Sequence, residues 1–281
     1  KKTVRQWASA EDTVRVAQLL KAPLRLSYIG CGGVLLEYGG EAILLDPYFS
    51  NISMAGAVTR PLKPDTALID AFFGARYPNG NAASVATVLI SHAHHDHLAD
   101  LPTVLRRHLP RERVQVFGSN TMVNILRSFP NLVADTAWQF RSLEQYFEVF
   151  SDVAGQPSRP THTPFIYTPL RKMRFVAIPS NHAGHYRFFG PNKLPFTEGE
   201  ISQPFLSPPT YALQFKEGKN FNYLIDLLDD AGNPIFRIVS TAGAATDNGV
   251  GFPSRIRRDS SESHLHRNRN MEHQSHAILS R

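Results

Sequence analysis

Short apolar runs alternate along the chain with segments rich in glycine, proline and polar residues. Runs of β-branched and aliphatic residues bounded by turn residues predict strands. Strands are predicted at 24–29, 34–38, 42–45, 86–90, 114–117, 173–179, 211–215, 222–227 and 234–240. Apolar spacing and start signals predict helices at 9–20, 66–73, 98–105 and 120–128. Two strand-rich halves with intervening helices therefore make up most of the chain.

The segments between these elements predict the domain organisation. A proline-rich connection at 150–170 separates the two halves, which run from about 24 to 150 and from about 170 to 250. We expect one domain over 1–253, followed by a polar tail at 254–281 that is disordered or poorly packed. The loop at 51–80 is a candidate substrate lid, with a short helix inside it. Aromatic residues at 186–209 could wall a pocket, although a packed Ω-loop is commoner.

Composition narrows the classes of protein. The single cysteine of the 281 residues excludes an internal disulfide framework and a zinc site built on cysteines. No apolar run is long enough to cross a membrane. The net charge of +6 is small, and the tail holds six arginines against three acidic residues, so nucleic-acid binding is not expected. The sequence is compatible with a cytoplasmic protein and with an exported one whose signal was removed. It carries no signal for a particular oligomeric state.

The densest candidate chemistry lies at Ser91-His92-Ala93-His94-His95-Asp96-His97, between a predicted buried strand and a predicted helix. Imidazole and carboxylate groups at this density favour a divalent transition metal, zinc first. His92 and His94 are two residues apart, so both side chains can lie on one side of an extended segment. Asp96 is well placed to cap the helix. A solvated histidine-rich loop is the alternative, which four histidines directly after a buried strand disfavour.

The residues His92-Ala93-His94-His95-Asp96-His97 resemble the H-x-H-x-D-H signature of the metallo-β-lactamase superfamily. The resemblance implies a four-layer αββα sandwich, of the α+β class. It implies that His92 and His94 bind one metal ion, that Asp96 and His97 bind a second, and that His95 is no ligand. Asp46, at the end of a predicted strand, resembles the aspartate that supports the metal loop in this family; a simple turn residue is the equal alternative.

A third ligand for the first ion is expected at the end of the strand at 173–179. Pro179-x-x-His182 resembles one branch of the superfamily, that of the ascorbate-phosphate lactonases and the phospholipase D acting on N-acyl-phosphatidylethanolamine. Ala183-Gly184-His185 instead resembles a segment of the lactamase and glyoxalase branches. We favour His182 as the ligand, with His185 as second choice, substrate contact or catalytic group.

The chain departs from the family after the strand at 234–240. A bridging aspartate is expected there, but Thr241-Ala242 follow Ser240, and the nearest acidic residue is Asp247. The tail histidines (His264, His266, His273 and His276) are better interpreted as surface residues than as ligands. One or two ions are therefore expected, Zn²⁺ first, with Mn²⁺, Fe²⁺ or Ni²⁺ as alternatives.

The resemblance implies a metal-dependent hydrolase in which metal-activated water attacks an ester, lactone or phosphodiester, with Asp96 orienting the nucleophile. The expected substrate is a small or lipid-like anionic ester. The alternative is a weak or inactive relative that binds a ligand or partner. A nuclease is less favoured, and the absence of G-x-S-x-G argues against a serine hydrolase.

Overall fold

A computed structural model describes residues 23–78, 82, 84–109, 114–133, 138–146, 150–151, 157–158, 162–182, 197–241 and 277–280. The predicted helix at 9–20 lies outside these residues. So do His185, Asp247 and the four tail histidines. In the described part of the chain, no helix has both the length and the apolar character needed to cross a membrane.

The first sheet has six strands in chain order, antiparallel from β1 to β3 and parallel from β3 to β6. They are β1 (Arg25–Gly30), β2 (Gly33–Tyr38), β3 (Glu41–Leu45), β4 (Val85–Leu89), β5 (Gln115–Gly118) and β6 (Gln139–Ser142). Parallel neighbours need crossover connections, and helices lie in these connections. The helices are α2 (Met54–Thr59), α3 (Thr66–Arg76), α4 (His95–Leu98), α5 (Leu101–His108), α6 (Asn120–Arg127) and α7 (Pro130–Val133).

The second sheet is antiparallel and has the strand order β13-β12-β11-β10-β9. Its strands are β9 (Ile166–Tyr167), β10 (Met173–Ser180), β11 (Asn220–Leu228), β12 (Pro234–Ser240) and β13 (Ala277–Ser280). A separate hairpin pairs β7 (Phe150–Ser151) with β8 (Pro157–Ser158). Two short 3₁₀ helices are η1 (Leu143–Tyr146) and η3 (Ala212–Gln214).

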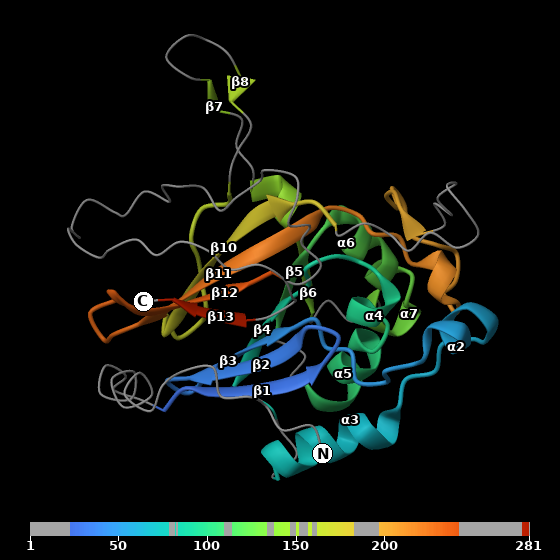
Figure 1. Ribbon diagram of the computed structural model, residues 1–281, viewed down its shortest axis with the longest axis horizontal. Coiled ribbons are helices and arrows are strands. Elements are labelled where there is room, and N and C mark those ends of the chain that lie inside the picture. Colours follow the sequence, from blue (N-terminus) through green and yellow to red (C-terminus); the bar gives the residue numbers. More distant parts are fainter. Residues whose placement is uncertain are drawn as a thin grey trace.

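The two sheets pack face to face, with the helices on the outer face of the first sheet (Figure 1). Alternation along each strand produces the two faces: Leu36 points to the second sheet, whereas Leu35 points to the helices. The inner layer includes Phe175 and Tyr223 from the second sheet, and the outer layer includes Ile69 of α3. The described residues thus form three layers: helices, first sheet and second sheet.

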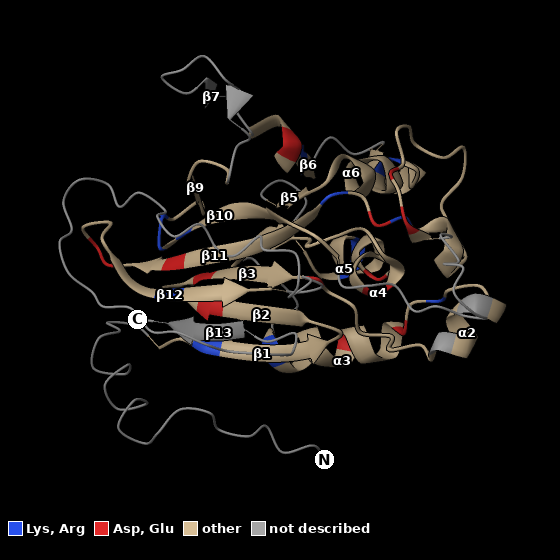
Figure 2. Ribbon diagram, turned by 45° about the horizontal axis from the view of Figure 1, so that its top comes forward, with Lys and Arg blue, Asp and Glu red and all other residues tan. Residues whose placement is uncertain are grey.

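A buried carboxylate lies within the second sheet. Asp226 is the acidic position in β11 (Figure 2), and its side chain is fully buried. The Nε atoms of Arg174 and Arg237 donate to it at 3.0 and 2.6 Å, so the flanking strands β10 and β12 each supply one partner. Such pairing is required because an isolated buried charge is strongly unfavourable.

The predicted sandwich of two sheets is confirmed, and most of the predicted strands are present. The helical layer expected on the outer face of the second sheet is not found among the described residues. The predicted strand at 211–215 is wrong: the segment forms η3, because the Gln214 side chain accepts hydrogen bonds from the Thr210 and Tyr211 amides and closes a turn. The loop at 51–80 holds two helices rather than one, α2 and α3. Four residues of the predicted tail form β13. The single domain over 1–253 stays a prediction.

Candidate metal site

The site lies where the carboxyl ends of β4 and β10 meet. Every residue of β4 is buried, and the chain leaves it through Ile90 and Ser91. The next turn is closed by the His94 carbonyl, which accepts from the His97 and Leu98 amides and starts α4. His94 occupies the N-cap position, whereas Asp96 lies in the first turn of α4. The prediction that Asp96 caps the helix is therefore wrong, because the helix begins before it.

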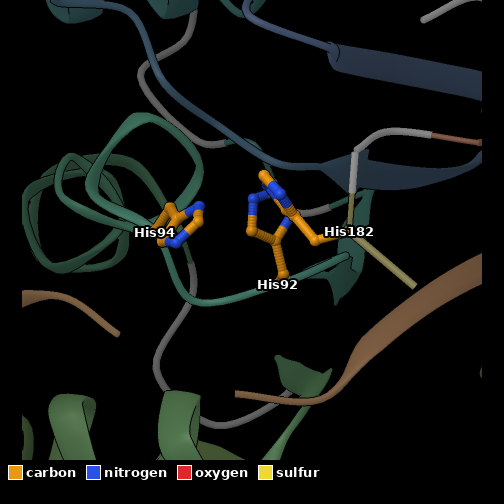
Figure 3. Close-up of side chains that lie close together, drawn as sticks. All are labelled: His92, His94 and His182. Carbon is orange, nitrogen blue, oxygen red and sulfur yellow. The ribbon is translucent and has the colours of Figure 1, made fainter. Parts of the chain in front are cut away.

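Three histidines converge at this point. His92 and His94 come from the loop after β4 and His182 from the end of β10, and each offers one ring nitrogen within 4.8 Å of the others. The rings of His92 and His182 have centroids 4.7 Å apart, and Figure 3 shows them facing the same space from different segments. His92 and His94 are buried, and His182 is partly exposed. The structure therefore brings together the three residues predicted for the first metal ion.

The orientation of His92 is set by Ser91. The Ser91 hydroxyl donates to Asp46 Oδ2 at 2.6 Å and lies 3.1 Å from His92 Nδ1. Because its proton is directed at Asp46, the hydroxyl can accept only from an Nδ1–H group. That tautomer puts the lone pair on Nε2, the nitrogen on the opposite side of the ring. The chain from Asp46 through Ser91 thus prepares His92 as a metal ligand.

His94 is oriented by a backbone carbonyl from a distant segment. Its Nε2 lies 3.2 Å from the carbonyl oxygen of Thr197. A carbonyl can only accept, so Nε2 carries the proton and Nδ1 carries the lone pair. Neutral imidazoles with oriented lone pairs are the donor set that zinc and other first-row ions take. The residues present therefore fit a metal ion.

Asp46 contacts two residues of the loop at 91–97. It has φ +40°, a conformation that residues other than glycine seldom adopt. Its Oδ1 accepts from the Ser91 amide at 2.7 Å, and its Oδ2 lies 3.1 Å from His97 Nδ1. Asp46 is therefore more than the turn residue that the sequence left as an alternative. It positions Ser91 and His97 at the same time.

Asp96 and His97, predicted to bind a second ion, lie beside the first three histidines. His97 Nε2 is 3.9 Å from Asp96 Oδ2, and the rings of His97 and His92 have centroids 4.0 Å apart. Burial acts to lower the pKa of His97, but the Asp46 and Asp96 carboxylates outweigh it and raise that pKa. Burial likewise acts against ionised Asp96, yet the neighbouring histidines, His97 first, lower the pKa of Asp96. Among the described residues, no third ligand completes a group around this pair.

The sequence missed two residues that shape the site. Ser91 was part of the motif but received no role, although a hydroxyl between a buried strand and a histidine is a usable signal. Thr197 acts through its backbone carbonyl, so no pattern of side chains in the sequence could have indicated its role. His95, expected not to bind metal, instead lies edge-on to Tyr48, with ring centroids 6.1 Å apart, and burial lowers the pKa of His95. The predicted catalytic residue His185 and the candidate Asp247 lie outside the described residues.

Comparison with known families identifies the domain. Residues 42–192, more than half of the chain, match the family described as a beta-lactamase superfamily domain. The chain belongs to the metallo-β-lactamase superfamily. The matched range contains His92, His94, Asp96, His97 and His182. No curated protein sequence matches this superfamily member significantly.

Solved structures similar to this superfamily member are distant from it in sequence. A metallo hydrolase of Ignicoccus hospitalis is 13% identical, with a TM-score of 0.32, and the match covers 73% of this chain and 56% of that one. A Parabacteroides distasonis protein described as a metal-dependent hydrolase is 13% identical, with a TM-score of 0.32, and the match covers 73% of this chain and 57% of that one. The metallo-β-lactamase SMB-1 is 12% identical, with a TM-score of 0.36, and the match covers 79% of this chain and 64% of that one. The chain therefore spans less than two thirds of the length of these proteins.

Proposed function

We propose that the protein is a metal-dependent hydrolase that acts on an ester, lactone or phosphodiester. The observation that carries the proposal is the convergence of His92, His94 and His182, each offering a ring nitrogen within 4.8 Å of the others. Membership of the metallo-β-lactamase superfamily supports it. Zinc is the expected ion because the donors are imidazoles, with manganese, iron or nickel as alternatives.

A bound ion would supply Lewis acidity and make water a nucleophile near neutral pH. The chain contributes orientation and proton handling. Ser91 and Thr197 hold the rings of His92 and His94 in fixed tautomers. Asp96 has a partly exposed carboxylate 3.9 Å from His97 Nε2, so it can orient an attacking water and accept its proton. His185 remains a candidate for a further hydrogen bond to substrate.

The substrate assignment goes further than the family. We propose the branch of the lactonases and the lipid-cleaving phospholipase D, because Pro179-x-x-His182 matches its pattern and His182 is one of the three convergent histidines. The expected substrate is a small or lipid-like anionic ester, and no nucleic acid is expected.

A second candidate is a weakly active or inactive relative that keeps one ion and binds a ligand. The observation that favours it is the end of β12. Ser240 and Thr241 offer hydroxyl groups where the family has a bridging carboxylate, and Asp96 and His97 have no third ligand among the described residues. Metal stoichiometry separates the two candidates, because only a complete second site retains a second ion.

The test is metal content per chain after dialysis, together with hydrolysis of soluble ester, lactone and phosphodiester substrates. We expect activity that a chelator abolishes and zinc or manganese restores. His182→Ala should lose bound metal and turnover, whereas His95→Ala is the matched control that should keep both. His97→Ala reports on the second ion, because its loss should lower the metal content only if two ions bind.

The outcomes are distinct. Metal bound by the wild type with no turnover on any substrate class would support the inactive relative. Turnover that survives chelation, or full metal binding by His182→Ala, would overturn the proposed hydrolase.

A further inference from the structure

Several exposed apolar side chains come from α7 and from the segment 197–215, whose first residue contacts His94. Of the nine large hydrophobic residues that are exposed in the described part of the chain, five come from α7 and from the segment 197–215. We call these five the apolar rim: Val133, Phe205, Leu206, Tyr211 and Leu213. Leu206 has a relative exposure of 107%, so its whole side chain stands in solvent. Such clustering on a monomer surface marks an interaction site more often than scattered apolar residues do.

The segment that carries the rim is anchored at the metal site. At its start, the Thr197 carbonyl lies 3.2 Å from His94 Nε2. Just past its end, the Glu217 carbonyl accepts from the Ala93 amide at 2.8 Å. The segment therefore leaves the site, carries four of the five rim residues and returns to the site.

The rim is held in place by the helices of the first half. The amide of Phe205 donates to Ser128 Oγ at the end of α6, at 2.8 Å. The Asn124 side chain donates to the Ile201 carbonyl at 2.7 Å. The amide of Leu62 donates to the Thr210 carbonyl at 2.6 Å, next to Tyr211. The apolar side chains are thus presented by anchored backbone at the end of the molecule where α2 projects (Figure 1).

Basic residues flank the same backbone contacts. Arg60 and Lys63 are exposed on either side of Leu62, and Arg127 is exposed next to Ser128. The nearby acidic groups are largely engaged: Asp65 accepts from the Leu68 amide at the start of α3, and Glu200 pairs with Lys219. Glu198 also lies in this segment and is partly buried. Asp65 and Glu198 keep their negative charge, so Arg60, Lys63 and Arg127 leave this surface with a small positive surplus beside its projecting apolar groups.

We propose that the apolar rim, with Arg60, Lys63 and Arg127, binds the surface of an anionic lipid membrane. Two signals are needed for stable attachment, an inserted apolar group and a basic patch, and both are present. A projecting leucine can enter the headgroup region, and the cations beside it can meet lipid phosphates. The inference goes beyond the proposed hydrolysis and does not depend on it.

The test is co-sedimentation of the full chain with vesicles, in the presence of a chelator so that catalysis plays no part. We expect binding to phosphatidylcholine vesicles that contain phosphatidylglycerol, and much weaker binding to phosphatidylcholine alone or at high salt. Leu206→Ser should weaken binding about tenfold, the effect of withdrawing one leucine from the interface. Replacing Arg60 or Lys63 with serine should weaken it about fivefold each.

Leu170→Ser is the matched control. Leu170 has a relative exposure of 62% and lies in the turn before β10, at the opposite end of that strand from His182. This variant should bind vesicles like the wild type. No binding to anionic vesicles, or equal loss in Leu170→Ser and Leu206→Ser, would overturn the proposal. Self-association in solution that Leu206→Ser abolishes, without vesicle binding, would make the rim a contact between copies instead.

The two proposals can fail separately. Vesicle binding without any turnover would support the proposed membrane-binding surface and contradict only the proposed hydrolase activity. Turnover of a soluble ester, unchanged in Leu206→Ser, without vesicle binding would do the reverse.

Discussion

At the scale of single residues, the site depends on groups that do not touch the expected metal. The Ser91 hydroxyl donates to the Asp46 carboxylate and accepts from His92 Nδ1–H, and the Thr197 carbonyl orients His94. A ligand whose second nitrogen is fixed in this way loses less rotational freedom when metal binds, and its basicity is higher. The metal affinity of the site should therefore depend partly on the Ser91 hydroxyl and the Thr197 carbonyl.

Ser91→Ala tests this positioning role. The variant keeps all three histidines but removes the acceptor for His92 Nδ1–H. We expect zinc affinity to fall by about tenfold or more, measured by competition with a chromogenic chelator. Ser84→Ala is the control, because the Ser84 hydroxyl lies at a long distance, 3.4 Å, from the Tyr77 hydroxyl and away from the site. Ser91→Thr should restore affinity; equal affinities in Ser91→Ala and wild type would remove the role.

Cys31 gives a second prediction at this scale. Burial, and then the charges of Asp96 and Asp100, raise the pKa of its thiol to about 11. Alkylation by iodoacetamide requires the thiolate, so its rate in metal-free protein should keep rising with pH up to about 11. In urea the profile should level off near the ordinary value, about 8.5. Cys31 is the one cysteine of the chain, so labelling is read without ambiguity. A folded-state midpoint near 8.5 would contradict the prediction.

The three convergent histidines and the support from Asp46 were within reach of sequence analysis, whereas the roles of Ser91 and Thr197 were not. His92 and His94 follow a buried strand in a dense motif, and His182 was chosen because it follows another strand and because Pro179-x-x-His182 resembles a segment of the superfamily. Ser91 and Thr197 belong to residue types that are common everywhere, and their roles come from where the loops fold. The bridging group of a second ion stays undecided for the same reason, because it depends on the path of the chain after Thr241.

At the scale of elements, a buried glutamate ties the two sheets together. Glu41, at the start of β3, accepts from Thr168 Oγ1 at 2.5 Å, from the Lys172 amide at 3.0 Å and from the Leu170 amide. These donors lie between β9 and β10, so a residue of the first sheet closes a turn of the second. Charged side chains beside a strand are mostly exposed, so the residue pattern did not indicate this contact.

Glu41→Gln should therefore destabilise the protein. The amide keeps one acceptor but turns an NH₂ donor toward groups that themselves donate, which leaves buried donors without an acceptor. We expect a loss of about 2–3 kcal/mol in the free energy of unfolding, measured by urea denaturation. Lys219→Ala, which breaks the exposed ion pair with Glu200, is the control and should cost less than about 1 kcal/mol. Similar losses in both variants would show that Glu41 does not link the sheets.

Helices and strands were predicted correctly where the apolar pattern was the only strong signal. They were predicted wrongly where local hydrogen bonding or turn residues competed with that pattern. The buried strands β3, β4 and β10 are short apolar runs between turns, and they were found within a residue or two. The segment at 211–215 has the aromatic and aliphatic residues of a strand, but Gln214 satisfies the local backbone and makes a 3₁₀ turn. Helix α2 was missed because proline and glycine around it suggested a loop.

At the scale of the whole molecule, the candidate metal site joins the two sheets. His92 and His94 follow a strand of the first sheet, and His182 follows a strand of the second. A metal held by all three would bind the folded chain in preference to the unfolded one, in which His182 is not held near His92 and His94. Metal binding should therefore report on the packing of the sheets as well as on the site.

This coupling gives a prediction about thermal stability. Zinc at about one hundred times its dissociation constant should add about 2.7 kcal/mol to the free energy of unfolding, which corresponds to a rise of about 5–10 °C in Tm. His182→Ala removes the ligand from the second sheet and should lose most of this rise, although it should unfold near the wild-type Tm when metal is absent. His95→Ala should keep the full rise, because His95 is not one of the three convergent histidines. A zinc-induced rise of equal size in His182→Ala would mean that the ion is held by the loop after β4 alone and does not join the two sheets.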